Sequence, residues 1–435
     1  MFNAIRKFIY AVVPNSILKA LLPIYHSILA HLANIYYGAP SNELFVIGVT
    51  GTAGKSTTVM MLSHILNSVG KKTGYVTTVG SSDGISTFTN TQGLSMPGGP
   101  TLQKNLHDFF AKGCKYVVIE ATSEGLAQNR HLGINFKAAL FTNLSPAHLD
   151  SHGGFENYRS AKGKLFEALD HNGIIGVNTD DPNYQYFLSF NAGKKFGTST
   201  REDRLPQTSV PVIRATDITV TNKINFKVEN VNFELNLKGS FNISNALLAI
   251  GMAQYIGVPL QESSEALRTF GTVPGRMETI PNNKNLTIIV DYAPEPEPLE
   301  QSLRTASLLE HGKLIHVFGA TGGHRDIAKR FEFGKISAKF ADTIIITNDD
   351  VYDSSQEEIA NNIKEGIEQV KKEERKVSEI IVEFDRRLAF KKALDIAEQN
   401  DLILITGKGN EQFLVLPGDK RINWDDRKVI KELLE

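Results

Sequence analysis

A glycine-rich loop stands between a predicted strand and a predicted helix early in the chain. It reads Gly-Thr-Ala-Gly-Lys-Ser-Thr over residues 51–57. Such a loop presents backbone N–H groups and a helix N-terminus to phosphates, its lysine adds a cation, and its serine hydroxyl can bind Mg²⁺. Val49 replaces the first glycine of the strict phosphate-loop pattern, but the strand–loop–helix context is kept. The sequence therefore predicts an ATP-phosphate site made by Thr50, Gly51, Thr52, Gly54, Lys55, Ser56 and Thr57.

Three further side chains stand where a nucleotide and its metal would need them. Glu120 ends a predicted strand, and His148 follows the next one. Ligands bind at the carboxyl ends of parallel strands, and Mg²⁺ prefers oxygen ligands. Lys162 lies one turn after Tyr158 on a predicted helix. Taken alone, His148 would be read as a structural histidine and Lys162 as a solvated lysine.

The composition excludes several other classes of protein. Among 435 residues, 47 basic and 48 acidic side chains leave a net charge of −1, so the sequence predicts no nucleic-acid partner. The single cysteine, Cys114, excludes a disulfide framework and a cysteine-rich zinc site and fits a reducing compartment. No apolar run reaches the ~18 residues that a transmembrane helix needs. We expect a soluble cytoplasmic protein without an obligate protein partner.

Alternating strand and helix patterns predict an α/β fold in three parts. Residues 1–42 form a short N-terminal helical arm, 43–274 a central P-loop-type ATPase domain with a parallel sheet, and 275–435 a C-terminal Rossmann-like α/β domain. Alternation at 208–240 predicts an antiparallel β-hairpin insertion in the central domain. Strands are expected at 44–49, 116–121, 138–143, 173–178, 286–292, 314–319, 343–347, 379–383 and 402–406, and helices at 55–69, 155–169 and 242–255.

The N-terminal arm has an unusual composition. Residues 1–42 hold three basic residues and no acid, with apolar residues at near-helical spacing. Pro14 and Pro23 are expected to divide the arm into short helices. Two interpretations stay open. The arm either packs on the body of the protein, or contacts a membrane peripherally through residues 1–40.

Segments spread along the chain resemble, in order, motifs of the Mur ligases, the ATP-dependent amide ligases of bacterial cell-wall peptide synthesis. The resemblance covers roughly residues 43–430 and is closest to the UDP-N-acetylmuramoyl-tripeptide synthetase branch. The segments are TGTAGKST (50–57), TNLSPAHLDSHG (142–153), YRSAK (158–162), GSFNISNA (239–246), VPGRME (273–278), DYA (291–293), VFGATGGHRD (317–326), GKGNE (407–411) and DDR (425–427).

The resemblance implies a nucleotide and metal site. Lys55 and Ser56 would bind the β- and γ-phosphates and one Mg²⁺, to which Glu120 and His148 would contribute. Lys162, as a carbamate formed with CO₂, would become an anion that supports a second Mg²⁺, and with Lys55 and His148 it makes up the expected catalytic set. The expected ATP contacts across the domain boundary are Asn245, Arg276 and Asp291.

The same resemblance implies the reaction. A substrate carboxylate attacks the γ-phosphate to give an acyl-phosphate and ADP, and the amine of an amino acid then displaces phosphate to form an amide. Arg325 would bind the carboxylate of that amino acid, while Glu411, with Gly407 nearby, would face its amine. The implied cofactors are ATP, two Mg²⁺ ions and CO₂. The implied substrates are an amino acid and a carboxylate acceptor, such as a muramoyl peptide.

Several features depart from the tripeptide-synthetase pattern. Only a short helical stretch precedes the loop where the family usually has a UDP-binding domain, Ser95-Met-Pro97 replaces Thr-Thr-Pro, and Pro294 replaces a histidine. The amino-acid specificity segment ends in Tyr352, which cannot supply a cation for a second carboxylate. Diaminopimelate is therefore disfavoured, and Asp349 and Asp350 are expected to be free to bind an amino group.

Other functions remain as alternatives. A folylpolyglutamate synthetase-like ligase also has two domains, and a ligase acting on a lipid-linked acceptor would suit the apolar arm. An amidating relative with a glutaminase partner usually carries a four-cysteine zinc insertion, which one cysteine cannot make. A non-catalytic ATP-binding module is the alternative from another class of protein. The motif residues that the chemistry needs are present, which favours an acid–amino-acid ligase.

Overall fold

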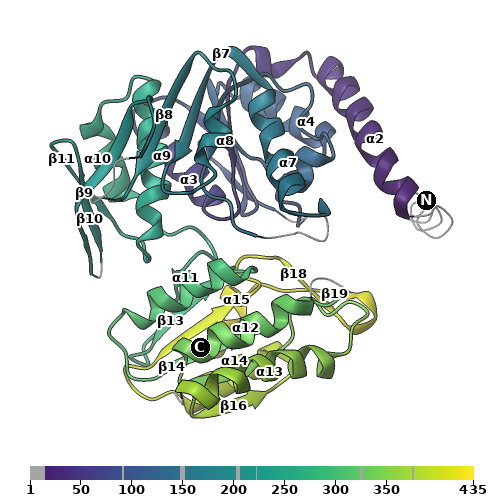
Figure 1. Cartoon of the computed structure of the whole chain (residues 1–435), viewed down its shortest axis with the longest axis vertical. Coiled ribbons are helices and arrows are strands. Elements are labelled where there is room, and N and C mark those ends of the chain that lie inside the picture. Colours follow the sequence, from purple (N-terminus) through teal and green to yellow (C-terminus); the bar gives the residue numbers. More distant parts are fainter. Residues whose placement is uncertain are drawn as a thin grey trace.

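The computed structural model describes residues 15–90, 93–146, 152–201, 206–221, 223–323, 327–374 and 377–435. His148 and Arg325 lie outside these ranges. The described chain forms two α/β bodies, each built on one large, mostly parallel sheet (Figure 1). The α/β fold class predicted from the sequence is confirmed.

The larger sheet has the phosphate-loop strand near its middle. In the described chain it contains eleven strands in the order β11-β10-β9-β8-β7-β6-β1-β5-β2-β3-β4, parallel from β9 to β2. The strands are β1 Phe45–Thr50, β2 Thr73–Val76, β3 Gly80–Ser82, β4 Thr87–Thr89, β5 Tyr116–Glu120, β6 Phe136–Phe141, β7 Leu169–Asn178, β8 Lys194–Ser199, β9 Val212–Val220, β10 Ile224–Val228 and β11 Val231–Leu235.

Helices cover both faces of this sheet, which explains why its central strands are apolar along their whole length. One hydrophobic core lies under α3, α9 and α10, and a second lies under α4, α5, α7 and α8. The helices of this body are α2 Asn15–Tyr36, α3 Lys55–Ser68, α4 Gly99–Ala111, α5 Ser123–Ala127, α7 Phe155–Glu167, α8 Tyr184–Leu188, α9 Phe241–Tyr255 and α10 Leu260–Thr269, with a 3₁₀ turn at Pro40–Asn42.

The predicted hairpin insertion at 208–240 is wrong in one respect. The structure places three strands there, and the first of them, β9, pairs in parallel with β8. The antiparallel pairs β9–β10 and β10–β11 then extend the same sheet to its edge. Alternation along one segment reveals strands but not their neighbours, because pairing with β8 depends on residues far along the chain.

The smaller sheet belongs to the C-terminal part of the chain. Its order is β12-β13-β17-β14-β15-β16. Within this sheet, β12 pairs antiparallel with β13, and the other described pairs are parallel. The strands are β12 Glu278–Thr279, β13 Thr287–Asp291, β14 Leu314–Phe318, β15 Thr343–Ile346, β16 Glu379–Val382 and β17 Leu402–Thr406, and a separate hairpin joins β18 Phe413–Leu416 to β19 Lys420–Asn423. The helices are α11 Pro296–Ser307, α12 Ile327–Phe340, α13 Gln356–Glu374, α14 Arg386–Ile396 and α15 Asp426–Leu434, with a 3₁₀ turn at Pro417–Asp419.

Within the described part of the arm, residues 15–36 form one helix, α2, and Pro14 lies outside the described residues. Helix α2 runs through Pro23, so the predicted break there is wrong. The hydroxyl of Ser27 donates a 2.7 Å hydrogen bond to the carbonyl of Pro23, and packing against α4 holds the following turns in place. Packing therefore outweighs the loss of one backbone donor. Among the described helices, none is long and apolar enough to cross a membrane.

Candidate active site

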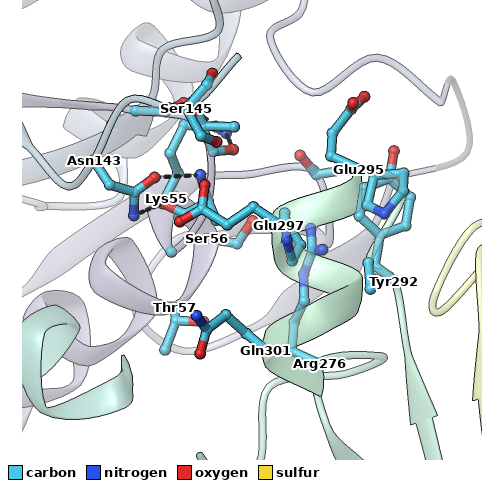
Figure 2. A pocket seen from close by; sticks show the side chains of 18 of the residues that line it. Lys55, Ser56, Thr57, Asn143, Ser145, Arg276, Tyr292, Glu295, Glu297 and Gln301 are labelled. Carbon is cyan, nitrogen blue, oxygen red and sulfur yellow. Dashed lines mark hydrogen bonds between the residues drawn. The ribbon is translucent and has the colours of Figure 1, made fainter. Parts of the chain in front are cut away.

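A large cavity lies between the two bodies, where strands of both sheets end. Its volume is about 1410 Å³. The glycine loop lines it from one side, and α11 and the segments after β15 and β17 line it from the other. Figure 2 shows Lys55 and Ser56 facing Glu297 of α11 across this space. Ligands of open α/β sheets bind at the carboxyl ends of strands, so the cavity is the candidate active site.

The loop is built so that only glycine fits at two positions. Gly51 and Gly54 have φ values of 151° and 80°. A Cβ on Gly51 would lie 1.9 Å from Thr142 Oγ1, and one on Gly54 would lie 2.2 Å from Asn245 Oδ1. The backbone therefore curls tightly before α3, as a phosphate cradle requires. Thr52 and Thr57 line the cavity with the loop, whereas Thr50 lies buried at the end of β1.

Lys55 points back over the loop. Its Nζ donates to the carbonyls of Gly51 and Thr52 at 3.1 and 2.9 Å and lies 3.9 Å from a carboxylate oxygen of Glu120. Burial lowers the pKa of the Lys55 ammonium, and the Glu120 carboxylate partly offsets that effect. A lysine held at the mouth of a phosphate loop is placed to neutralise phosphate charge.

Glu120 and Ser56 place a carboxylate and a hydroxyl side by side. Ser56 Oγ donates to Glu120 at 2.7 Å, and the backbone N–H and hydroxyl of Thr78 both donate to the same carboxylate at 2.9 Å. Glu120 is almost fully buried, so these donors hold the carboxylate in one orientation. A carboxylate beside a hydroxyl suits Mg²⁺, and the two side chains fit the metal that the sequence predicts.

Lys162 is brought next to the loop by α7. Its Nζ donates to the Gly51 carbonyl at 2.8 Å and lies 4.4 Å from the ring centroid of Tyr158. Burial lowers the pKa of the Lys162 amine well below its ordinary value, and the nearby Lys55 ammonium lowers it further. The interpretation as a solvated lysine is therefore wrong, because the side chain is only 2% exposed.

Three predicted nucleotide contacts surround the loop. Asn245 of α9 accepts a hydrogen bond from Thr58 Oγ1 at 3.5 Å. Arg276 stacks over the ring of Tyr292 at 4.3 Å, and both side chains face the cavity (Figure 2). Asp291 also lines the cavity, but one of its carboxylate oxygens accepts from the Met277 N–H and the other from Ser302 Oγ.

The predicted amino-acid pocket contains a buried lysine, Lys408, next to the two aspartates that were expected to be free. Lys408 Nζ lies 2.8 Å from Asp350, 2.5 Å from Glu411 and 3.9 Å from Asp349. Asp350 also accepts from the Val415 N–H at 2.9 Å, so the expectation that Asp350 is free is wrong. These carboxylates raise the pKa of Lys408 against the opposing effect of burial. The cluster holds three carboxyl groups and one lysine, and burial raises the pKa of the Asp350 and Glu411 carboxyls.

A second buried ion pair positions this pocket. Arg386 donates to both carboxylate oxygens of Asp426 at 2.8 and 2.7 Å, and neither side chain is exposed. The guanidinium also donates to the carbonyls of Asn348 and Thr406. It thereby fixes the backbone just before Asp349 and Gly407, where a bidentate arginine is geometrically specific. Position 407 requires glycine for two reasons: its φ is 113°, and a Cβ there would lie 2.6 Å from Asp349 Oδ2.

Two supporting residues escaped the reasoning from sequence. Asn143 pins the loop, since its side chain accepts from the Ala53 N–H at 2.9 Å and donates to the Ala53 carbonyl at 3.2 Å. Its place directly after a strand, within the segment 142–153, was an available signal. Thr78 orients Glu120 from the end of β2, 42 residues earlier. Only the pairing of β2 with β5 brings it there.

Two arginines of the cavity wall were also missed. Arg130 donates to the Met96 carbonyl at 2.7 Å and lines the cavity beside Ser123. Arg421 of β19 stacks over the ring of Phe413 at 3.6 Å and lines the cavity as well. Neither belongs to a glycine-rich or acidic motif, so only the fold reveals them.

Comparison with known proteins agrees with this geometry. The Mur ligase middle domain model matches residues 49–253, and the model of the Mur ligase glutamate ligase domain matches residues 275–409. A UDP-N-acetylmuramoyl-L-alanyl-D-glutamate–2,6-diaminopimelate ligase of Clostridium botulinum is 37% identical over 94% of this chain and 81% of the relative. The chain belongs to the Mur ligase family.

Other similar proteins are also named as ligases or synthetases that act on muramoyl peptides. A UDP-N-acetylmuramyl-tripeptide synthetase of Roseiflexus is 36% identical over 93% of this chain and 82% of the relative. A solved 2,6-diaminopimelate ligase has 27% identity and a TM-score of 0.59, covering 90% of this chain and 78% of that one. The protein is an ATP-dependent acid–amino-acid ligase, as the sequence predicts.

Proposed function

We propose that this Mur ligase adds an amino acid to a muramoyl-dipeptide acceptor such as UDP-N-acetylmuramoyl-L-Ala-D-Glu. The observation that carries the proposal is the shared cavity. The phosphate loop with Glu120 and Lys162 opens into the same space as the acidic cluster of Asp349, Asp350 and Glu411. A site that activates a carboxylate with ATP and then admits an amine needs both groups in one enclosure.

Each nucleotide residue has a proposed task. Lys55 neutralises the γ-phosphate during attack by the acceptor carboxylate, and Asn245, Arg276 and Asp291 bind the rest of ATP. Ser56 and Glu120 would hold Mg²⁺, which would supply further charge neutralisation. We also propose that His148 helps to bind Mg²⁺ and that Arg325 binds the carboxylate of the amino acid. Both residues lie outside the described ranges.

Lys162 is proposed to act as a carbamate. Burial and the nearby Lys55 ammonium lower the pKa of the Lys162 amine well below its ordinary value, which favours the neutral amine that can attack CO₂. The product carries a negative charge beside the Lys55 ammonium, so carbamate formation adds an attraction between the two groups. Such an anion also suits a second Mg²⁺.

Arg130 is the proposed anchor for the acceptor. Its guanidinium is held by Gln128 and the Met96 carbonyl, and it lines the cavity with the segment 93–96. A positioned arginine binds a carboxylate through two N–H donors. This cation can therefore orient a second carboxylate of the acceptor while another one reacts.

We expect an amino acid with a distal amino group, because three carboxyl groups surround the single lysine of this pocket. Asp349→Asn is expected to raise the KM for such an amino acid at least about tenfold with little change in kcat, since an amide removes one charge–charge contact. The measurement is initial-rate kinetics with L-lysine, L-ornithine, diaminopimelate and L-alanine. An unchanged KM for every diamino acid would contradict the assignment.

Arg421→Ala serves as the matched variant in that panel. Diaminopimelate carries a distal carboxylate that lysine lacks, and Arg421 is a cation of the same cavity wall. If diaminopimelate is the substrate, Arg421→Ala lowers its turnover selectively. If lysine is the substrate, Arg421→Ala leaves kcat/KM for lysine within about threefold, which agrees with the absence of a cation at Tyr352.

We also propose that the protein contacts a membrane peripherally through residues 1–40. The support is the composition of the arm, which has basic but no acidic residues, and the exposure of apolar side chains along α2. The reaction itself needs no membrane, because ATP and an amino acid are both water-soluble.

A further inference from the structure

Helix α2 exposes an unusual row of large apolar side chains. In the described chain, seven of the sixteen large apolar side chains that are exposed lie on this one helix, with exposed fractions of 53% to 82%. At ~100° of rotation per residue they fall within an arc of about 120°. They are Leu21, Ile24, Tyr25, Ile28, Leu32, Ile35 and Tyr36. We call this set the α2 stripe.

The opposite side of α2 is fixed to the protein. Ala30 is fully buried, and a Cβ on Gly99 at the start of α4 would lie 2.7 Å from the Ala30 Cβ. The side chain of Asn129 donates to Ser27 Oγ at 3.1 Å. Because the helix is docked through small residues on one side, the α2 stripe faces outward. Figure 1 shows α2 at the edge of the larger body, away from the smaller sheet.

Charge separates the possible occupants of this surface. Residues 1–42 contain three of the 47 basic residues and none of the 48 acidic ones, so the remaining chain has 44 basic against 48 acidic side chains. The 14 residues that precede α2 continue the mixture of apolar residues with Arg6 and Lys7. An apolar helical face with two tyrosines, in a segment whose charged residues are all basic, matches an anionic lipid surface.

We propose that the α2 stripe docks the enzyme on an anionic membrane, with the helix lying in the plane of the interface. Leucine, isoleucine and tyrosine side chains enter the boundary between headgroups and acyl chains, and the net positive charge of residues 1–42 favours an anionic surface over a neutral one. Docking buries apolar surface that the described chain otherwise leaves in water.

Docking has a consequence for the acceptor that rests on the proposed function. The stripe helix packs on Gly99, and the segment just before Gly99 carries Met96, whose carbonyl accepts from Arg130. The docked helix thus adjoins the segment that we assign to the acceptor. A membrane-docked enzyme would hold this side of its cavity near the lipid surface.

The experiment is vesicle flotation of the full chain. Vesicles of phosphatidylcholine with 30% phosphatidylglycerol in about 0.1 M salt are compared with vesicles of phosphatidylcholine alone. The wild-type protein is expected to float with the anionic vesicles, and Ile28→Glu with Leu32→Glu to reduce the bound fraction at least about tenfold. Both positions are more than half exposed, so the fold tolerates the change.

Leu308→Glu is the matched control, because Leu308 is 79% exposed directly after α11 and lies outside the stripe. It should float like the wild type. The proposal is overturned if the wild type does not float with anionic vesicles, or if Leu308→Glu loses flotation equally. It is also overturned if the wild type is a dimer that the stripe variant makes monomeric without flotation, since the occupant is then a second copy. Ligase turnover with soluble substrates, measured on the same samples, keeps failure of the proposed reaction distinguishable from failure of docking.

Discussion

Lys162→Gln is expected to lower kcat by on the order of 1000-fold, because it removes the group that we propose to become an anion beside Lys55. Removing bicarbonate and CO₂ from the buffer should lower the activity of the wild-type enzyme in the same way, and adding bicarbonate should restore it. The lowered pKa of the Lys162 amine sets the sign of the pH dependence. Carbamate forms from the neutral amine, so activity supported by bicarbonate should extend to lower pH than an ordinary lysine would allow, and should fall as the pH drops and the amine is protonated.

The control for this prediction is Lys164→Gln on the same helix. Lys164 is partly exposed and donates to Asn129 Oδ1 at 3.1 Å, so its loss should change kcat by less than about twofold. Carbon-13 NMR with ¹³CO₂ gives a direct readout, because the wild type should show a carbamate signal that Lys162→Gln lacks. Full activity of the wild type in bicarbonate-free buffer, together with no carbamate signal, would show that Lys162 acts as an amine.

Glu120→Gln is expected to lower kcat at least about 100-fold and to raise the Mg²⁺ concentration for half-maximal rate. The carboxylate accepts three hydrogen bonds from Ser56 and Thr78 and lies 3.9 Å from Lys55. An amide at this position removes a metal ligand charge and turns an N–H₂ group toward one of these donors. Mg²⁺ titrations of the initial rate measure both effects.

Glu124→Gln provides the comparison for Glu120. Glu124 is exposed on the wall of the same cavity, so its loss should leave the Mg²⁺ dependence unchanged. Binding of ATP in the presence of EDTA should be similar in the wild type, Glu120→Gln and Glu124→Gln. This comparison separates a defect in metal binding from misfolding. If Glu120→Gln keeps the wild-type Mg²⁺ dependence, Glu120 is a structural residue and the metal lies elsewhere.

Much of the fold follows from local sequence patterns. Leu314–Gly319 and Leu402–Thr406 are short apolar runs bounded by polar residues, and both are strands within one residue of the prediction. The loop at 51–57 was equally readable, because a phosphate cradle demands glycine at fixed spacing. The neighbours of β9 and the continuity of α2 through Pro23 were not readable, since each depends on packing against segments distant in sequence.

The site shows the same division. Residue types and spacing identified Lys55, Ser56 and Glu120, whereas the role of Lys162 came from the family resemblance and its burial came from the structure. Asp350 was misjudged because its partner, Lys408, follows 58 residues later on a different strand end. A buried ion pair depends on two separate segments, and one segment alone cannot indicate whether its carboxylate is free.

The most direct test of the ligase assignment is transfer of ¹⁸O. The acceptor UDP-N-acetylmuramoyl-L-Ala-D-Glu, labelled with ¹⁸O in its carboxylates, is incubated with Mg-ATP, bicarbonate and the amino acid selected in the panel. The account predicts amide formation with one ¹⁸O in each phosphate released, because the carboxylate oxygen that attacks the γ-phosphorus leaves with it when the amine forms the amide. Unlabelled phosphate accompanying amide formation would contradict the acyl-phosphate route, and ATP hydrolysis without any amide would contradict the proposed substrates.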